Sequence, residues 1–479
     1  MNWAWPYVIL YIVLPMLVIL ILAWVFLFPE DKNESQKKYV VNFKLRNGKF
    51  KIGNLRRGVS IIGSAGSGKT ESVVYNFLQH LAKYEFCGII HDYKDFELTE
   101  IAYPLFKDKS VKFYTISFDK IYNRVNPIAP RYLPNEESIN EISKVLLENL
   151  LEQNTSEGNN SSRFFTDAVE GLLSGLIWKM KTSYPQYCTL PHVIALFQSM
   201  NTKKLVAFLS SDFTSRSMAS AFINGIESEK QTAGVKSTLA NAFKKISSHK
   251  LFYVLSKDEV PLDINRKENK SIISIVNNPQ YESAYLPIIA SVIHTVIKQM
   301  SVRNRESSFI LMEEAPTLKL LNMHRIPATL RSYDIATIYV MQDKIQNDML
   351  YGEKASRAIL SNLSYQFFGK VNDPDTAKYY ERFFEIIKNP TRSISKGTGL
   401  SWDSRVTKGE REVPKRRAEV FFRLKQGEFI GFADGRDKRL IFKLQRIIKK
   451  KQPEIRDNDF DSLIFVYNQI YKEIKDLKI

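Results

Sequence analysis

The apolar positions of this chain form one long run at the N-terminus and several short runs farther on. Residues Trp3 to Phe28 carry no charged side chain, and these 26 residues exceed the roughly 20 that a helix needs to cross a bilayer. Trp5 and Trp24 stand near the two ends of the run, as in interfacial aromatic belts. The pattern predicts a membrane-spanning helix, kinked at Pro15.

A secretory signal peptide is the alternative for this segment, but such a peptide has a basic stretch before a shorter apolar run. Here Lys32, Lys37 and Lys38 follow the run, and no basic residue precedes it. Because basic residues are retained on the cytoplasmic side, we expect the N-terminus outside and the bulk of the protein in the cytoplasm. The predicted location is the inner (cytoplasmic) membrane, with a single pass.

Farther along, short apolar runs alternate with stretches of helical spacing. The short runs are typical of buried parallel strands. They lie at residues 58–62, 271–276, 308–312 and 335–341, and another strand is expected to end at His91-Asp92. Residues 134–256 lack strand patterns, and helical spacing there covers 139–151, 164–181, 190–200 and 217–249. The chain therefore combines a parallel sheet with a long helical segment.

A glycine-rich loop follows the first short run and precedes an amphipathic helix over 71–83. The loop matches the phosphate-binding pattern G-x-x-x-x-G-K-[ST]. Its residues are Gly63, Ser64, Ala65, Gly66, Ser67, Gly68, Lys69 and Thr70. In such a loop the backbone N–H groups and the helix N-terminus bind phosphate oxygens. We expect Lys69 to reach the β- and γ-phosphates of ATP, and Thr70 to supply a hydroxyl to Mg²⁺.

Paired carboxylates end the run Ser308–Met312. We expect Glu313 to hold the metal, directly or through water, and Glu314 to polarise the attacking water. The alternative is that both acids only precede a helix beginning near Pro316, where negative charge suits the dipole.

Two further residues have weaker signals. Gln342 ends the run at 335–341, where a polar side chain would face the γ-phosphate or orient water. Arg331 lies between the acid pair and Gln342, and an arginine from a neighbouring subunit can neutralise charge that develops on the transferred phosphoryl group. A surface salt bridge is the alternative for Arg331.

Composition adds a preference for polyanionic partners. The 69 Lys and Arg residues exceed the 51 Asp and Glu residues, for a net charge of +18, which favours nucleic acid or anionic lipid. Between Thr391 and Pro453, 18 basic residues face 7 acidic ones. Cys87 and Cys188 match no metal or redox spacing, so we expect buried or free thiols.

The order of these motifs resembles that of TraG/TraD-type coupling proteins of type IV secretion. The resemblance covers residues 42–444. Its elements are the anchor, the glycine loop, a strand ending in His91-Asp92-Tyr93-Lys94, a helical stretch, Phe309–Leu318, Arg331 and Gln342. Lesser matches are Asn126-Pro127-Ile128, Gln231–Leu239 and Asp375-Thr376-Ala377.

The resemblance implies a RecA-like P-loop NTPase domain, of the α/β class, with an inserted all-α domain. The predicted division is an anchor and juxtamembrane segment (1–38), the first part of the nucleotide-binding domain (39–133), the all-α insertion (134–256), the second part of the nucleotide-binding domain (257–450) and a helical tail (451–479).

The resemblance also implies a membrane-anchored ATPase that links relaxase-bound DNA to a type IV secretion channel during conjugation. It implies a homo-hexameric ring with Arg331 acting in trans. Two alternatives remain. The first is a nucleotide-gated receptor and assembly platform without motor activity, and the second is a pump for double-stranded DNA of the segregation or packaging type.

The chain departs from the family pattern at three points. Lys94 is followed by Asp95-Phe96 where the family has glycine, Glu313 replaces the usual aspartate, and one membrane helix is predicted where many members have two. These departures bear on the subfamily and the membrane topology.

Sequence-independent contacts with DNA, taken to be single-stranded, are expected from basic side chains. The candidates are Lys370, Lys378, Arg392, Lys396, Arg416 and Arg417. Residues 393–409 form either a pore-lining loop or a disordered surface loop, and the second is preferred. Residues 461–479 have helical spacing and form either a partner-docking helix or, by preference, a peripheral packing helix.

Overall fold

The computed structural model describes residues 11, 13–17, 19, 36–151, 160–396, 404–453 and 459–477. The predicted anchor, Trp3–Phe28, lies for the most part outside these residues. Among the residues that are described, no helix is both long enough and apolar enough to cross a membrane.

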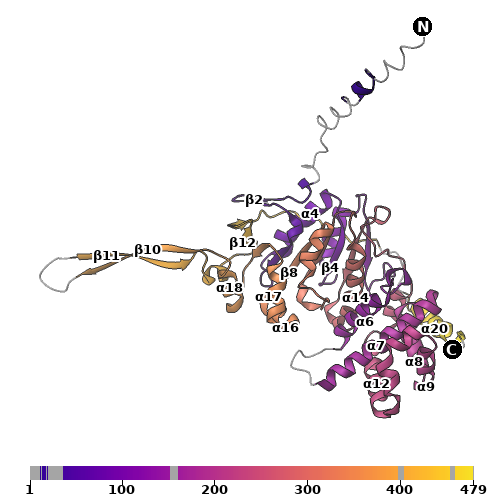
Figure 1. Ribbon diagram of the computed structural model, residues 1–479. Coiled ribbons are helices and arrows are strands. Elements are labelled where there is room, and N and C mark those ends of the chain that lie inside the picture. The colour runs from indigo at the N-terminus through magenta and orange to yellow at the C-terminus, as the bar shows by residue number, and fades with distance from the viewer. Residues whose placement is uncertain are drawn as a thin grey trace, which may run out of the picture.

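A nine-stranded mixed sheet forms the centre of the protein (Figure 1). Its order is β13 (Arg436–Ile441), β12 (Glu428–Ala433), β9 (Tyr365–Phe368), β3 (Val59–Ile62), β8 (Ile335–Met341), β7 (Ser308–Met312), β4 (Cys87–Asp92), β6 (Ser271–Val276) and β5 (Lys112–Ile116). The strands from β9 to β5 are parallel, and β12 and β13 add antiparallel pairs at one edge. The predicted apolar runs are confirmed as strands, and β3, β4, β6, β7 and β8 are buried throughout.

The strand register aligns the carboxyl ends of the central strands. Ile62 of β3 lies opposite Met341 of β8, and Met312 of β7 lies opposite both Tyr339 of β8 and His91 of β4. The loops that follow these four strands therefore leave the sheet at one edge, which is where open α/β sheets bind ligands.

Two apolar cores cover the two faces of the sheet. One face packs against α4 (Tyr75–Lys83), α5 (Glu97–Phe106) and the hairpin of β1 (Val41–Leu45) and β2 (Gly48–Ile52). The other face packs against α14 (Glu282–Met300), and its core continues without a break into the helical segment. This continuity stabilises the helical segment against the sheet.

The helical segment lies between β5 and β6. It comprises α6 (Glu136–Leu150), α7 (Asn160–Ser183), α8 (Leu190–Ser199), α9 (Thr202–Ser210), α10 (Phe213–Met218), α11 (Ser220–Asn224), α12 (Glu229–Lys245) and α13 (His249–Leu255). We refer to α6–α13 as the helical insertion. The prediction of one helix over 217–249 is wrong, because the chain turns at Gly225 and α12 restarts at Glu229.

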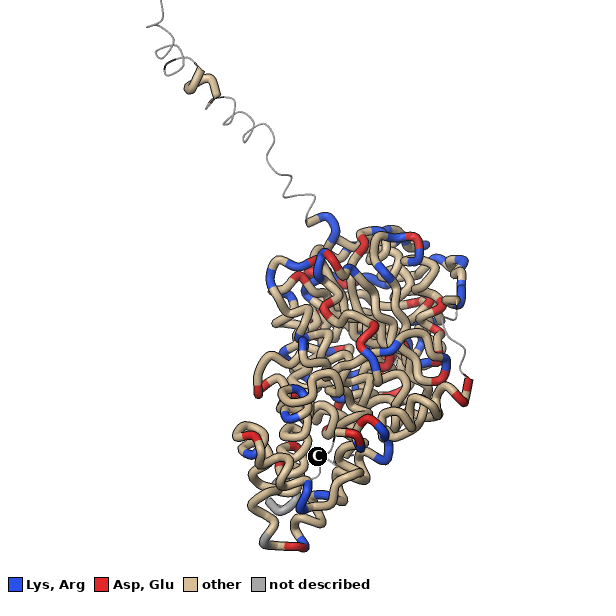
Figure 2. Tube along the Cα trace, turned by 90° about the vertical axis from the view of Figure 1, so that its right-hand side faces the viewer, with Lys and Arg blue, Asp and Glu red and all other residues tan. Residues whose placement is uncertain are grey.

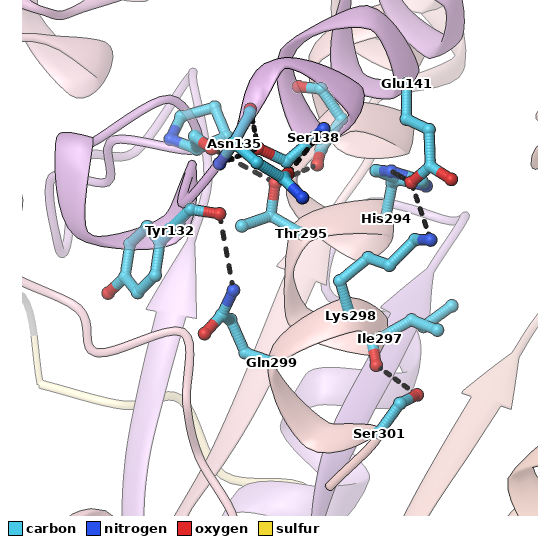
Figure 3. Close-up of polar contacts among 12 residues, drawn as sticks. Tyr132, Asn135, Ser138, Glu141, His294, Thr295, Ile297, Lys298, Gln299 and Ser301 are labelled. Atoms are coloured by element: carbon cyan, nitrogen blue, oxygen red, sulfur yellow. Dashed lines mark hydrogen bonds and ion pairs between the residues drawn. The ribbon is translucent and has the colours of Figure 1, made fainter. Parts of the chain in front are cut away.

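A polar junction joins the helical insertion to the sheet. The Glu141 carboxylate of α6 accepts a hydrogen bond from Lys298 Nζ of α14 at 2.6 Å, and His294 Nε2 lies 3.6 Å from it (Figure 3). Next to it, the Asn135 side chain accepts a hydrogen bond from the Ser138 backbone N–H and caps α6. These contacts fix α6 along α14.

The C-terminal helix α20 (Phe460–Asp476) packs against α8 and α13 of the helical insertion (Figure 1). Its Tyr467 and Tyr471 rings contact Phe252, and Glu473 pairs with His192 at 2.9 Å. The structure therefore agrees with the preferred prediction of a peripheral packing helix.

A two-stranded ribbon projects from the body (Figure 1). It pairs β10 (Ile386–Lys396) with β11 (Ser404–Pro414) in antiparallel register. The preference for a disordered loop over 393–409 is therefore wrong for the described residues, since 393–396 and 404–409 are paired strand; residues 397–403 lie outside the description. The β-branched pair Ile387 and Val413, opposite each other in the register, favours this ribbon.

Candidate nucleotide site

The glycine loop leaves β3 at Gly63 and turns into a helix at Lys69, as predicted. Gly66 and Gly68 have φ values of 73° and 86°, a left-handed conformation that side chains disfavour. A Cβ at Gly68 would also lie 2.9 Å from the backbone nitrogen of Gly427. The helix begins with a wide turn, η3 (Lys69–Val74), and continues as α4. The backbone thus has the strand–loop–helix form of a phosphate cradle.

Lys69 lies inside this loop rather than in solvent. Its Nζ donates to the Gly63 carbonyl at 2.5 Å and contacts the Ser64 carbonyl at 3.4 Å. Burial lowers the pKa of Lys69, and the negative charge of Glu314 opposes that shift. The ammonium group is therefore held at the loop and is within electrostatic reach of the acid pair.

Glu313 and Glu314 follow β7 at the same edge of the sheet. Both are almost completely buried, with 3% and 2% of their surface exposed. Glu314 has φ of 45°, a strained conformation of the kind found at functional sites. Gln342 Nε2 donates to Glu314 Oε1 at 3.0 Å. Since β8 lies between β3 and β7, Gln342 stands between the glycine loop and the acids.

Lys94 is a site residue to which sequence reasoning gave no role. It follows β4, and its Nζ lies 3.8 Å from Glu313 Oε1 and 3.5 Å from Glu314 Oε1. The Lys94 side chain is partly exposed, whereas the two acids are not. A cation from the neighbouring strand therefore neutralises the buried pair. The available signal was the position of Lys94 just beyond a strand end, in the motif that also contains His91 and Asp92.

Glu313 and the ionisable side chains near it have strongly shifted pKa values. Burial raises the pKa of Glu313 to about 8, and the nearby charge of Asp92 adds to that shift. Burial also raises the pKa of Asp92 to about 6, against hydrogen bonds from Thr99. His91 is neutral, since burial lowers its pKa to about 4, and its Nδ1 lies 3.0 Å from the Glu313 carbonyl. A carboxylate in such surroundings favours an added cation.

The oxygen atoms at this site fit a magnesium ion that takes most of its ligands from phosphate and water. Glu313 Oε2 is buried and has no hydrogen-bond partner within the described part of the chain. No group of three His, Cys, Asp or Glu residues there is arranged to enclose a metal. Mg²⁺ is usually held by one or two protein oxygens plus nucleotide phosphates. Glu313 and the Thr70 hydroxyl are the groups that would hold it.

Arg331 does not join this cluster within one chain. It lies in the turn before β8, whereas Gln342 follows the other end of that strand. Seven strand residues span about 23 Å at roughly 3.3 Å each. The Arg331 side chain is exposed at the opposite edge of the sheet.

The six basic residues proposed for DNA contact are distributed over several elements. The Lys370 carbonyl accepts a hydrogen bond from Ser64 N in the glycine loop, and Lys378 belongs to α18 (Pro374–Glu381). Arg416 pairs with Asp437 at 3.0 Å. The others are Arg417, which precedes α19 (Ala418–Phe422), and Arg392 and Lys396 in β10. Of these residues, Lys378, Arg416 and Arg417 come from neighbouring elements, because α18 contacts α19.

The sequence of this chain was compared with protein families and with curated proteins. Residues 49–416 match the family model described as the type IV secretion-system coupling protein DNA-binding domain. No curated protein matched the chain.

Solved structures extend this likeness. The unbound bacterial conjugative coupling protein TrwBdeltaN70 aligns with a TM-score of 0.67 and 11% identity, covering 86% of this chain and 90% of that one. The plasmid coupling protein TrwB in complex with ADP and Mg²⁺ aligns with a TM-score of 0.64 and 12% identity, covering 83% of this chain and 87% of that one. VirB4 of Thermoanaerobacter pseudethanolicus aligns with a TM-score of 0.52 and 12% identity, covering 85% of this chain and 96% of that one. At these identities the likeness shows a shared fold.

Proposed function

The chain belongs to the family of type IV secretion-system coupling proteins, and we propose that it hydrolyses Mg²⁺-ATP to drive DNA toward a secretion channel. The observation that supports this proposal is that β3 and β7 end at the same edge of the sheet, so the charges of Glu314 and Glu313 act on Lys69. A similar fold, that of TrwB, is described in complex with ADP and Mg²⁺.

The proposed roles follow from the positions of the side chains. The loop N–H groups and Lys69 bind the β- and γ-phosphates. Thr70 and Glu313 would hold a magnesium ion, which would supply charge neutralisation at the phosphates. Glu314 accepts a proton from the attacking water, and Gln342 fixes the carboxylate of Glu314 by its hydrogen bond. Lys94 neutralises the acid pair, and a bound cation would compete with it for the same carboxylates.

The remaining roles in this proposal depend on the assembly. Arg331, exposed at the far edge of the sheet, completes the site of a neighbouring subunit in a homo-hexamer. Residues 1–38 anchor the ring in the inner membrane, 39–133 and 257–450 form the motor, 134–256 form the all-α domain, and 451–479 form the tail. Relaxase-bound DNA and the channel components are its partners.

Steady-state ATP turnover by the full chain, with and without single-stranded DNA, tests the proposal. We expect turnover to rise with DNA, and the rise to fade with added salt, because phosphate contacts are salt-sensitive. The alternative, a nucleotide-gated receptor, would be indicated if DNA left ATP turnover unchanged and Lys69→Ala kept conjugative transfer intact. Equal turnover stimulation by double-stranded DNA would favour the packaging-type pump.

A further inference from the structure

Basic residues without acidic neighbours in the sequence gather in two segments of the chain. Residues 36–57 include eight Lys or Arg and no Asp or Glu, and residues 438–453 include seven Lys or Arg and no Asp or Glu. Figure 1 places β2, from the first segment, at the upper end of the body, and Lys and Arg are frequent at that end in Figure 2. A surface of one sign attracts partners of the opposite charge.

The two segments are joined in the fold. Leu45, at the end of β1, forms a β-bridge with Phe442. From there the chain runs to α5, where the backbone N–H of Lys450 donates to the Glu100 carbonyl at 2.9 Å. We refer to residues 442–453 as the crossing segment. The β1–β2 hairpin and the crossing segment both belong to the layer that covers the α4–α5 face of the sheet.

The cations of this layer face solvent and lack acidic partners. Side chains of β1 and β2 alternate between buried and exposed, and each lysine of the two strands is exposed. Lys44 and Lys49 lie directly opposite each other, an arrangement that costs stability because like charges repel. Apart from Arg56, Arg57 and Arg439, no cation of the two segments makes an ion pair with another described residue. The layer therefore keeps a net positive charge at its surface.

Large aliphatic side chains are exposed between the cations of the crossing segment. Leu444 is 87% exposed and Ile448 is 64% exposed, whereas Ile447 between them packs against the core. Surfaces that bind single-stranded DNA stack its bases on aromatic rings, and the crossing segment has no aromatic residue after Phe442. Exposed aliphatic and basic side chains in one segment instead fit a bilayer surface, where the apolar groups enter the acyl boundary and the cations stay at the phosphates.

The surface also lies where the chain would leave a membrane. The Gln36 carbonyl accepts a hydrogen bond from the backbone N–H of Tyr39, which packs in the core beneath the hairpin. Phe28, the last residue of the uncharged run, precedes Gln36 by eight residues, a reach of at most about 28 Å. An inserted anchor would therefore hold this surface near the lipid headgroups. This step, unlike the preceding ones, rests on the proposed function.

We propose that the outer surface of the β1–β2 hairpin and the crossing segment binds the anionic headgroups of the cytoplasmic leaflet, with Leu444 and Ile448 entering the interface. Polybasic segments next to a membrane are attracted by the negative potential of that leaflet. Bound in this way, the nucleotide-binding fold is oriented on the bilayer by its own surface as well as by a tether.

The test follows the surroundings of residue 444 with an environment-sensitive fluorophore. Leu444→Cys in the full chain is labelled with nitrobenzoxadiazole, and Phe213→Cys, at a position of the helical insertion that is also 87% exposed, is the matched control. Cys87 and Cys188 are buried and stay unlabelled. With vesicles that contain phosphatidylglycerol, emission from residue 444 should shift to the blue, and emission from residue 213 should not. The shift should be lost at high salt and with phosphatidylcholine alone, because salt screens the attraction. A signal from residue 444 that is the same with and without phosphatidylglycerol would overturn the proposal.

Charge variants show whether the cations cause the shift. Four combined substitutions in the layer should abolish it: Lys44→Gln, Lys49→Gln, Lys443→Gln and Arg446→Gln. Four combined substitutions of exposed lysines on the helical insertion remove the same charge and should leave it intact: Lys203→Gln, Lys204→Gln, Lys230→Gln and Lys244→Gln. Equal shifts in the two variants would contradict the proposal.

DNA is the other polyanion to consider, and its binding is measured by fluorescence anisotropy of labelled single-stranded DNA without lipid. Loss of DNA affinity in the layer variant, together with emission from residue 444 that does not respond to lipid, would make this surface a DNA contact and overturn the proposal. Extraction with alkaline carbonate tests the anchor separately. A chain that washes off the vesicles would count against the anchor of the proposed function, while the dependence of the shift on phosphatidylglycerol would still decide the role of this surface.

Discussion

Two groups of acidic residues in this protein have opposite surroundings. At the sheet edge, Glu313 and Glu314 are buried, and Lys94 and Gln342 from neighbouring strand ends already contact them. On the helical insertion, Glu136, Asp167 and Glu170 line an open cavity between α6, α7 and α10, and the charge of Lys144 acts on Glu170. The first arrangement suits replacement of the Lys94 ammonium group by a bound metal ion. The second is open to solvent, so water and salt screen its charges.

The largest expected effect is on ATP turnover, which should depend on the acids at the sheet edge and not on those of the helical insertion. Glu314→Gln keeps the hydrogen-bonding shape but removes the base, so ATP turnover should fall by about 10²–10⁴-fold. Binding of a fluorescent ATP analogue should persist, because Lys69 and the loop are intact. Asp167→Asn is the matched control and should leave turnover unchanged. Comparable losses in both variants would mean that the acids do not have separate roles.

Next in size is the effect of removing the internal cation. Lys94→Gln should strengthen Mn²⁺ binding to the nucleotide-free protein by about tenfold, since a lysine no longer competes for Glu313 and Glu314. Electron paramagnetic resonance of free Mn²⁺ measures this affinity directly. Lys109→Gln, at an exposed lysine, is the control. An affinity unchanged from that of the parent chain would argue against Lys94 as the counter-ion of the pair.

A smaller effect concerns stability against pH. The pKa of Glu313 is raised to about 8 in the folded state, so the folded protein binds a proton that the unfolded chain has released. Stability should therefore fall as pH rises from about 4.5 toward 8. Glu313→Gln should flatten that slope and unfold at least about 2 °C higher than the parent at the alkaline end. Parallel pH profiles for the two proteins would contradict the burial of an ionisable Glu313.

The smallest effect is at the junction shown in Figure 3. Hydrogen bonds from His294 and Lys298 lower the pKa of Glu141 to about 2, so the stabilisation is complete above about pH 4.5 and is lost as pH falls toward 2. About a third of the Glu141 side chain is exposed, and solvent screens the pair. Glu141→Gln should therefore cost less than about 1 kcal/mol of unfolding free energy in urea at neutral pH. A larger loss would mean that this contact carries the junction.

The sequence predicted those parts of the fold and site that depend on local pattern. The glycine loop has its own spacing, and apolar runs marked β7 and β8, so Glu313 and Gln342 were found. The contact of Lys94 with the acids depends on β4 and β7 being neighbours, which no local pattern encodes. For the same reason, the approach of Gly427 to the glycine loop had no signal.

Other features were missed for different physical reasons. Gly, Ser and charged residues dominate the β10–β11 ribbon and predict a loop, whereas cross-strand pairing decides its structure. The helix over 217–249 was overextended across Gly225. The cavity on the helical insertion joins residues from α6, α7 and α10, so its acids were not recognised as a group.

The most direct test of the account is a structure of the chain with Mg²⁺ and a non-hydrolysable ATP analogue. We predict that Lys69 and Thr70 contact the phosphates and the metal, that Glu313 and Glu314 face the same metal and the γ-phosphate, and that Lys94 has left the acid pair. A nucleotide bound at the glycine loop with its metal remote from both acids, and Lys94 still paired with them, would contradict it.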